Sequence, residues 1–203
     1  MTNVTPDFVI NARTLTRHVN HSDAPVWWGI IGLILIELSV VAAFTVSYIY
    51  LRLMNNEWPP NDIAPPELAL PSWTLGLLLV SCVTMYLSGK HLEKDNINRF
   101  VFFTFLSVAL ALIVLGIRWQ QMSALSVRWD EHVYGSLLWT ISGFHFMHVV
   151  SAAIGTAAIG FFGVAGFFNK KRQIGVVVDT LYWNFVAEAW LPFYVVLYLI
   201  PRI

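Results

Sequence analysis

Five long apolar segments alternate with short polar segments along the chain. About 17 to 25 apolar residues suffice for a helix to cross the hydrocarbon of a bilayer, because an α-helix rises about 1.5 Å per residue. The apolar segments cover residues 26–52, 73–89, 100–117, 134–168 and 174–200. The pattern therefore predicts an all-α polytopic membrane protein with five transmembrane helices, which form one membrane domain over residues 26–203.

The composition supports a membrane protein and excludes several other classes. The chain is 57% hydrophobic and only 12% charged, and its mean hydropathy is +0.65, outside the range of soluble domains. Because the formal net charge is zero, no general electrostatic field is available for nucleic acid, and we expect no nucleic-acid partner. Cys82 is the single cysteine, so the chain has no internal disulfide and too few thiols for a zinc or iron–sulfur cluster.

The polar segments predict how the chain crosses the membrane. Residues 1–25 contain no apolar core of the kind that a cleaved secretory signal needs, so we interpret them as a short cytoplasmic tail. Eight Lys and Arg residues lie in the tail and in the second and fourth connections, against four on the opposite side. The positive-inside rule then predicts a cytoplasmic N-terminus and a C-terminus outside.

Several ionisable and polar side chains fall inside the predicted spans. Such groups are expensive in hydrocarbon, so they normally turn toward other helices. His145 and His148 are three residues apart and share one helical face. Glu37 lies in the first span, and we predict that its carboxylate meets the two imidazoles. The candidate buried polar, structural or proton-relay residues are Glu37, His145, His148, Asn184 and Glu188.

The residues alone leave three interpretations of this set open. The histidines can form structural hydrogen bonds to Glu37 or to a hydroxyl, bind a metal together with a carboxylate, or relay protons. In the last span, Asn184 precedes Glu188 by four residues, so its amide could donate a hydrogen bond to the Glu188 carboxyl. A satisfied structural acid and a proton carrier are both open for Glu188.

Two motifs resemble those of a known family. The sequence Gly143-Phe-His-Phe-Met-His-Val149 resembles the Gly-Phe-His-Gly-Leu-His-Val motif of subunit III of the haem-copper terminal oxidases. The sequence Tyr182-Trp-Asn-Phe-Val-Ala-Glu-Ala-Trp190 resembles that family's Tyr-Trp-His-Phe-Val-Asp-Val-Val-Trp. The span that holds Trp28 and Glu37 is similar to a helix of the family that carries a buried glutamate. The resemblance covers about residues 26–200.

The chain also departs from the family pattern. Asn184 and Ala187 stand where the family has a histidine and an aspartate, and Glu188 is a new acid. Arg118-Trp119-Gln120-Gln121 replaces the family's acidic and aromatic end of the third span. Five spans instead of seven resemble a divergent, short bacterial form. The alternative within this resemblance is an accessory subunit of a nitric oxide reductase.

The resemblance implies an accessory, non-redox subunit of a respiratory oxidase. Such a subunit has no catalytic residue and no metal, haem or copper of its own, since haem and copper belong to its partners, subunit I and subunit II. It binds phospholipid in a cleft between its first two helices and the rest, and it supports oxygen delivery, proton uptake and turnover stability. The implied location is the bacterial inner membrane, and the tryptophans expected to anchor the chain at interfaces with lipid are Trp27, Trp28, Trp183 and Trp190.

Two interpretations from other classes remain open beside the oxidase subunit. A stand-alone transporter of protons or small solutes would use Glu37, His145 and Glu188 as a relay. A membrane metalloenzyme would hold stoichiometric metal.

Overall fold

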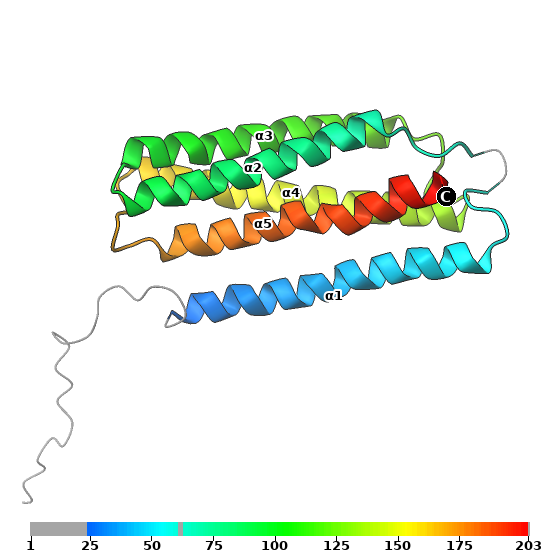
Figure 1. Ribbon diagram of the computed structural model, residues 1–203, viewed down its shortest axis with the longest axis horizontal. Helices are drawn as coiled ribbons and strands as arrows, with labels where there is room; N and C mark the ends of the chain where they lie inside the picture. The colour runs from blue at the N-terminus through cyan, green and yellow to red at the C-terminus, as the bar shows by residue number, and fades with distance from the viewer. Residues whose placement is uncertain (1–23, 61–62, 203) are drawn as a thin grey trace, which may run out of the picture.

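The computed structural model describes residues 24–60 and 63–202, and its long elements are all helices. They lie side by side with nearly aligned axes (Figure 1). The bounds are α1 Pro25–Met54, α2 Ala69–Glu93, α3 Ile97–Ser123, α4 Val133–Val164 and α5 Ile174–Tyr194. Each is long and apolar enough to cross a membrane. The prediction of an all-α polytopic protein with five such helices is confirmed, whereas residues 1–23 of the predicted tail lie outside the described residues.

The fourth helix ends before the apolar pattern does. The predicted span is 134–168, but α4 ends at Val164 because Gly166 adopts a left-handed conformation with φ of 73°. The Phe167 N–H donates to the Phe162 carbonyl at 2.9 Å, which closes a Schellman turn. Glycine adopts this backbone without the steric cost that a Cβ would add. Hydropathy alone does not detect such a stop, since apolar residues continue past it.

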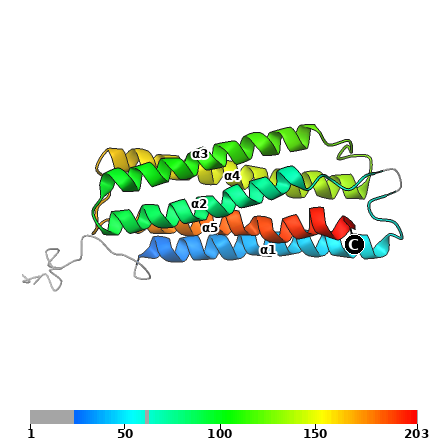
Figure 2. The ribbon, with the colours of Figure 1, turned by 45° about the horizontal axis from the view of Figure 1, so that its top comes forward.

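Four of the helices form a ring, and α1 lies outside it. Helix α2 packs along α3, α3 along α4, α4 along α5 and α5 along α2. Helix α1 packs mainly on α5, with smaller contacts to α4, and its ribbon lies beside that of α5 in Figure 2. A division between the first two helices and the rest, implied by the family resemblance, is therefore wrong, because α2 belongs to the ring.

Hydroxyl pairs join α2 to α3 inside the ring. The Thr84 and Ser107 hydroxyls lie 2.6 Å apart, and those of Ser88 and Thr104 lie 2.7 Å apart. All four side chains are buried. Since lipid tails are as apolar as leucine, helices in a bilayer associate through close packing and hydrogen bonds. These pairs hold α2 and α3 in one register.

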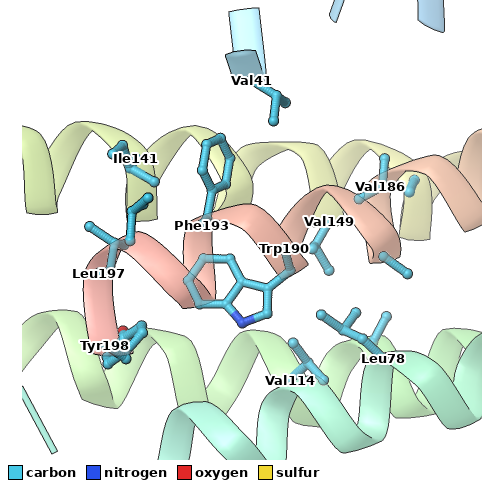
Figure 3. Close-up of a cluster of buried hydrophobic side chains, with 14 of the residues drawn as sticks. Val41, Leu78, Val114, Ile141, Val149, Val186, Trp190, Phe193, Leu197 and Tyr198 are labelled. Atoms are coloured by element: carbon cyan, nitrogen blue, oxygen red, sulfur yellow. The ribbon is translucent and has the colours of Figure 1, made fainter. Parts of the chain in front are cut away.

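The apolar core centres on the end of α5. Trp190 and Phe193 have no exposed surface, and they pack between the other helices of the ring and α1 (Figure 3). Pro192 has no N–H to donate to the Glu188 carbonyl, so the regular ladder is interrupted there. A π-helical turn, η3 (Val195–Leu199), and a 3₁₀ turn, η4 (Ile200–Arg202), continue the chain. Three side chains of η3 are buried in the core: Val196, Leu197 and Tyr198.

Gly135, in the first turn of α4, is predicted to tolerate no side chain. A Cβ there would collide with the backbone carbonyl oxygen of Arg128 and with Val127. Since backbone cannot move aside as a flexible side chain does, Gly135→Ala should cost about 1–3 kcal/mol of stability. Thermal unfolding of the purified chain in detergent measures this loss. Gly116→Ala is the control, since nothing lies within 4 Å of its Cβ position, and equal midpoints for both variants would contradict the prediction.

Candidate functional site

A carboxylate and an imidazole meet where α1 crosses α4. The Glu37 Oε1 atom lies 3.5 Å from the His148 Nε2 atom. The two side chains are only 15% and 21% exposed, respectively. Both residues lie well inside helices, since α1 covers Pro25–Met54 and α4 covers Val133–Val164. The expected contact between Glu37 and His148 is therefore present.

The other ring nitrogen of His148 indicates which nitrogen carries the proton. The His148 Nδ1 atom lies 2.8 Å from the Phe144 carbonyl oxygen, one turn earlier in α4. A carbonyl only accepts, so Nδ1 carries the proton, and Nε2 is left to face Glu37. The carboxylate and the imidazole are then polar neighbours across α1 and α4, which lowers the cost of burying both groups.

A third residue, Tyr182 of α5, completes the cluster. Its hydroxyl donates to the Glu37 Oε1 atom at 3.3 Å. The Glu37 Oε2 atom is buried and has no hydrogen-bond partner among the described residues. Sequence reasoning missed Tyr182, although it opens the second motif, because the spacing of residues on α5 does not indicate which of them faces α1.

His145 does not take part in this cluster. Its Nε2 atom lies 3.0 Å from the Val186 carbonyl oxygen, and its ring packs on Trp190 with centroids 4.7 Å apart. The prediction that Glu37 meets both imidazoles is therefore wrong for His145. Residues three apart on a helix differ by about 60° in direction. That angle turns His148 toward α1 and His145 toward α5.

The predicted pairing of Asn184 with Glu188 is absent. Glu188 is exposed on α5, and the Asn184 Oδ1 atom is buried without a partner. No hydrogen bond or ion pair joins Glu188 to another residue in the part of the chain that the structure describes, and the Cys82 thiol of α2 is its electrostatic neighbour. The prediction that Glu188 is buried within this chain is wrong, since α5 turns position 188 away from the ring.

The four tryptophans that we predict to anchor the chain in lipid differ in their exposure. Trp183 and Trp190 are 3% and 0% exposed, so the prediction that they anchor the chain in lipid is wrong. The Trp183 Nε1–H donates to the Ser81 hydroxyl at 2.9 Å, which joins α5 to α2. Trp27 and Trp28 lie in the first turn of α1, and Trp28 is 64% exposed. Their role at the membrane interface stays a prediction.

The two histidines do not converge on one point. The two histidines bind different neighbours, and no described residues form a group of three or more His, Cys, Asp or Glu side chains that could hold a metal ion. A metal site needs several ligands that converge on one point. The cluster of Glu37, His148 and Tyr182 can instead hold three helices together and bind one proton.

Comparison with known proteins connects this chain to one family. The family model described as cytochrome c oxidase subunit III matches residues 1–201. Cytochrome c oxidase subunit 3 of Thermostichus vulcanus is 23% identical over 175 residues, which cover 86% of this chain and 87% of that protein. The Homo sapiens protein of the same name is 24% identical over 177 residues, covering 84% and 68%. The Emericella nidulans protein is 30% identical over 151 residues, covering 71% and 54%.

Replacement of Glu37 tests the cluster. Glu37→Leu leaves the His148 imidazole and the Tyr182 hydroxyl without their shared acceptor, so it should destabilise the chain by about 1–3 kcal/mol. Glu37→Gln keeps an oxygen acceptor and should lose less than half as much. Thermal unfolding in detergent measures both losses.

Glu188→Leu is the matched control for Glu37→Leu. It removes an acid of the same type from an exposed position, so it should not lower the unfolding midpoint. Equal losses for Glu37→Leu and Glu37→Gln would show that the hydrogen bonds do not stabilise the cluster.

Proposed function

The chain belongs to the cytochrome c oxidase subunit III family, and from this premise we propose that it is the accessory, non-redox subunit III of a proton-translocating haem-copper oxidase. The observation that carries the proposal is the family match over residues 1–201, joined to a fold of five membrane-spanning helices. In this role the chain reduces no oxygen by itself. Haem and copper reside in its partner subunits, and phospholipid binds at its surface.

The partners are the catalytic subunit I and subunit II. The exposed surface of α1 supports docking, since only 6% of its most apolar window is buried within the chain. Glu188 supports it as well, because an exposed carboxylate in a transmembrane helix is costly against lipid and favourable against a polar group of a partner. An exposed carboxylate that needs a partner protein favours an accessory subunit over a stand-alone transporter.

Within the complex, the Glu37 cluster holds α1 against the ring. An aromatic contact assists it, since the Phe44 and Phe144 rings pack edge to face at 5.2 Å. The outer side of α1 exposes apolar side chains, including Leu35 at 62% and Val46 at 63%, against which acyl chains can pack. Support of oxygen delivery, proton uptake and turnover stability follows from this stable, lipid-coated attachment to the catalytic subunit.

We place the complex in the bacterial inner membrane, in the short five-helix form. The alignment with the Thermostichus vulcanus protein supports the short form, since it covers 87% of that protein and only 68% of the human one. The orientation rests on the Lys and Arg bias. The predicted bias is eight positive residues against four, and one of those four, Arg118, lies inside α3 beyond the predicted end of that span at residue 117.

Reporter fusions test the orientation. A reporter fused after residue 203 should lie outside the cytoplasm, and one inserted in the connector 170–172 should lie inside, because that connector carries three positive residues. Alkaline phosphatase and green fluorescent protein fusions measure the two sides in intact cells. If both sites report the same side, the proposed topology fails.

Purification through a tag on this chain tests the function. The native complex should show haem absorbance and reduce oxygen, whereas the chain expressed alone should be colourless, because its partners hold the redox centres. Visible spectroscopy and an oxygen electrode supply the two measurements. A haem spectrum from the isolated chain, or a native complex without haem, would overturn the assignment.

The same preparation with Glu37→Gln separates structural support from proton transfer. If the cluster is structural, the variant complex keeps its haem content and its rate of oxygen reduction. Loss of oxygen reduction with normal assembly and haem content would assign the Glu37 carboxylate to a proton path.

A further inference from the structure

A permanently charged side chain is buried near the end of α3 with no acid beside it. Arg118 is 1% exposed, and its Nε, Nη1 and Nη2 atoms have no hydrogen-bond partner of regular geometry among the described residues. Its guanidinium stacks 3.1 Å from the centroid of the Trp190 ring. The nearby Tyr198 hydroxyl interacts with the guanidinium but carries no charge that would neutralise it, and His145 is the other electrostatic neighbour. A cation–π contact supplies no acceptor for N–H groups. Burying a charge without a counter-ion costs free energy, and arginine does not avoid that cost by losing its proton.

Two adjoining cavities lie near this guanidinium. The smaller, about 10 Å³, lies among α3, α4 and η3 and is lined by Arg118, Gln121 and Ser142 among others. The larger, about 330 Å³, lies between the loop residues 63–67 and the α3–α4 loop. Four residues line both cavities: Gln121, Leu125, Leu138 and Tyr198. The larger cavity therefore lies next to the smaller one, on the side of the loops at the end of the helix bundle.

The polar groups that line these two cavities include several unpaired donors. The Arg118 guanidinium offers five N–H groups, and the buried Gln121 amide nitrogen and Tyr134 hydroxyl also lack partners. No carboxylate lines the smaller cavity, and Glu67 is the only one that lines the larger. The acceptors that line the smaller cavity are the Gln121 Oε1 atom and the Ser142 and Tyr198 hydroxyls, which are neutral and do not balance the charge of the guanidinium. A water molecule brings donors of its own, whereas a small anion only accepts.

We propose that Arg118 and Gln121 form a binding site for one small monovalent anion, chloride under cellular conditions. The anion enters through the larger cavity and lies in the smaller one, where charge-assisted hydrogen bonds from the guanidinium are strong because water is excluded. It neutralises a buried charge that the chain itself leaves unpaired. The site is independent of the role proposed for the chain in an oxidase.

The size of the cavity selects the occupant. A volume of about 10 Å³ holds about one water-sized sphere, so an ion of one atom fits after a slight shift of the flexible Gln121 and Met122 side chains. A phosphate group or a partner's carboxylate side chain is too large for this space. The Trp190 ring covers one face of the guanidinium and leaves its edge, which carries the N–H groups, for the anion.

Thermal unfolding of the full chain in detergent tests the site. Sodium chloride or sodium bromide is compared with sodium gluconate, whose anion is too large to enter, at equal ionic strength. Chloride and bromide should raise the unfolding midpoint of the wild-type chain by about 5 °C over gluconate. Arg118→Met should lose this dependence, and Arg118→Lys should keep part of it because the charge remains.

Arg128→Met is the matched control. Arg128 lies in the α3–α4 loop, exposed and paired with Asp130 at 2.8 Å, so its replacement should leave the halide dependence at the wild-type size. The control separates the site from general salt effects, which act equally on all variants. Equal dependence in the wild type and in Arg118→Met would overturn the proposal.

A direct measurement decides the case in which Arg118→Met does not fold. Crystals of the wild-type chain grown in bromide should give an anomalous scattering peak beside the Arg118 guanidinium. Absence of the peak from well-ordered density would overturn the proposal, because bromide would then not occupy the cavity.

Discussion

Polar side chains inside hydrocarbon can bind only one another, and this constraint governs the arrangement of the five helices. Lipid provides neither donors nor acceptors, so each buried hydroxyl, imidazole or carboxyl needs a partner from another helix or from its own backbone. The Thr84–Ser107 pair joins α2 to α3, and the Trp183 indole joins α5 to Ser81 of α2. These hydrogen bonds define how neighbouring helices are placed, and apolar side chains fill the space between them.

The attachment of α1 follows from the same constraint. Helix α1 has few buried residues, and its one acid, Glu37, binds His148 of α4 and Tyr182 of α5. This cluster joins three helices through polar groups that the chain itself supplies. Arg118, near the end of α3, is the opposite case, since its charge has no acidic counterpart among the described residues. We propose that an ion balances that charge.

Helix α5 connects these two regions. Tyr182 reaches α1, Trp183 reaches α2, and Trp190 packs between His145 and Arg118.

The sequence alone determined the number of membrane-spanning helices, the membrane class, the family, and the positions of Glu37 and His148 within the first and fourth helices. Length, hydropathy and motif spacing are properties of the chain itself. Only the tertiary structure decided that His148 and not His145 binds Glu37, that Trp183 and Trp190 are buried, and that Glu188 is exposed. The apolar pattern is nearly uniform around each helix, since lipid and protein interior are equally apolar. Hydropathy therefore does not predict which face of a helix is buried. The contacts between helices determine that face.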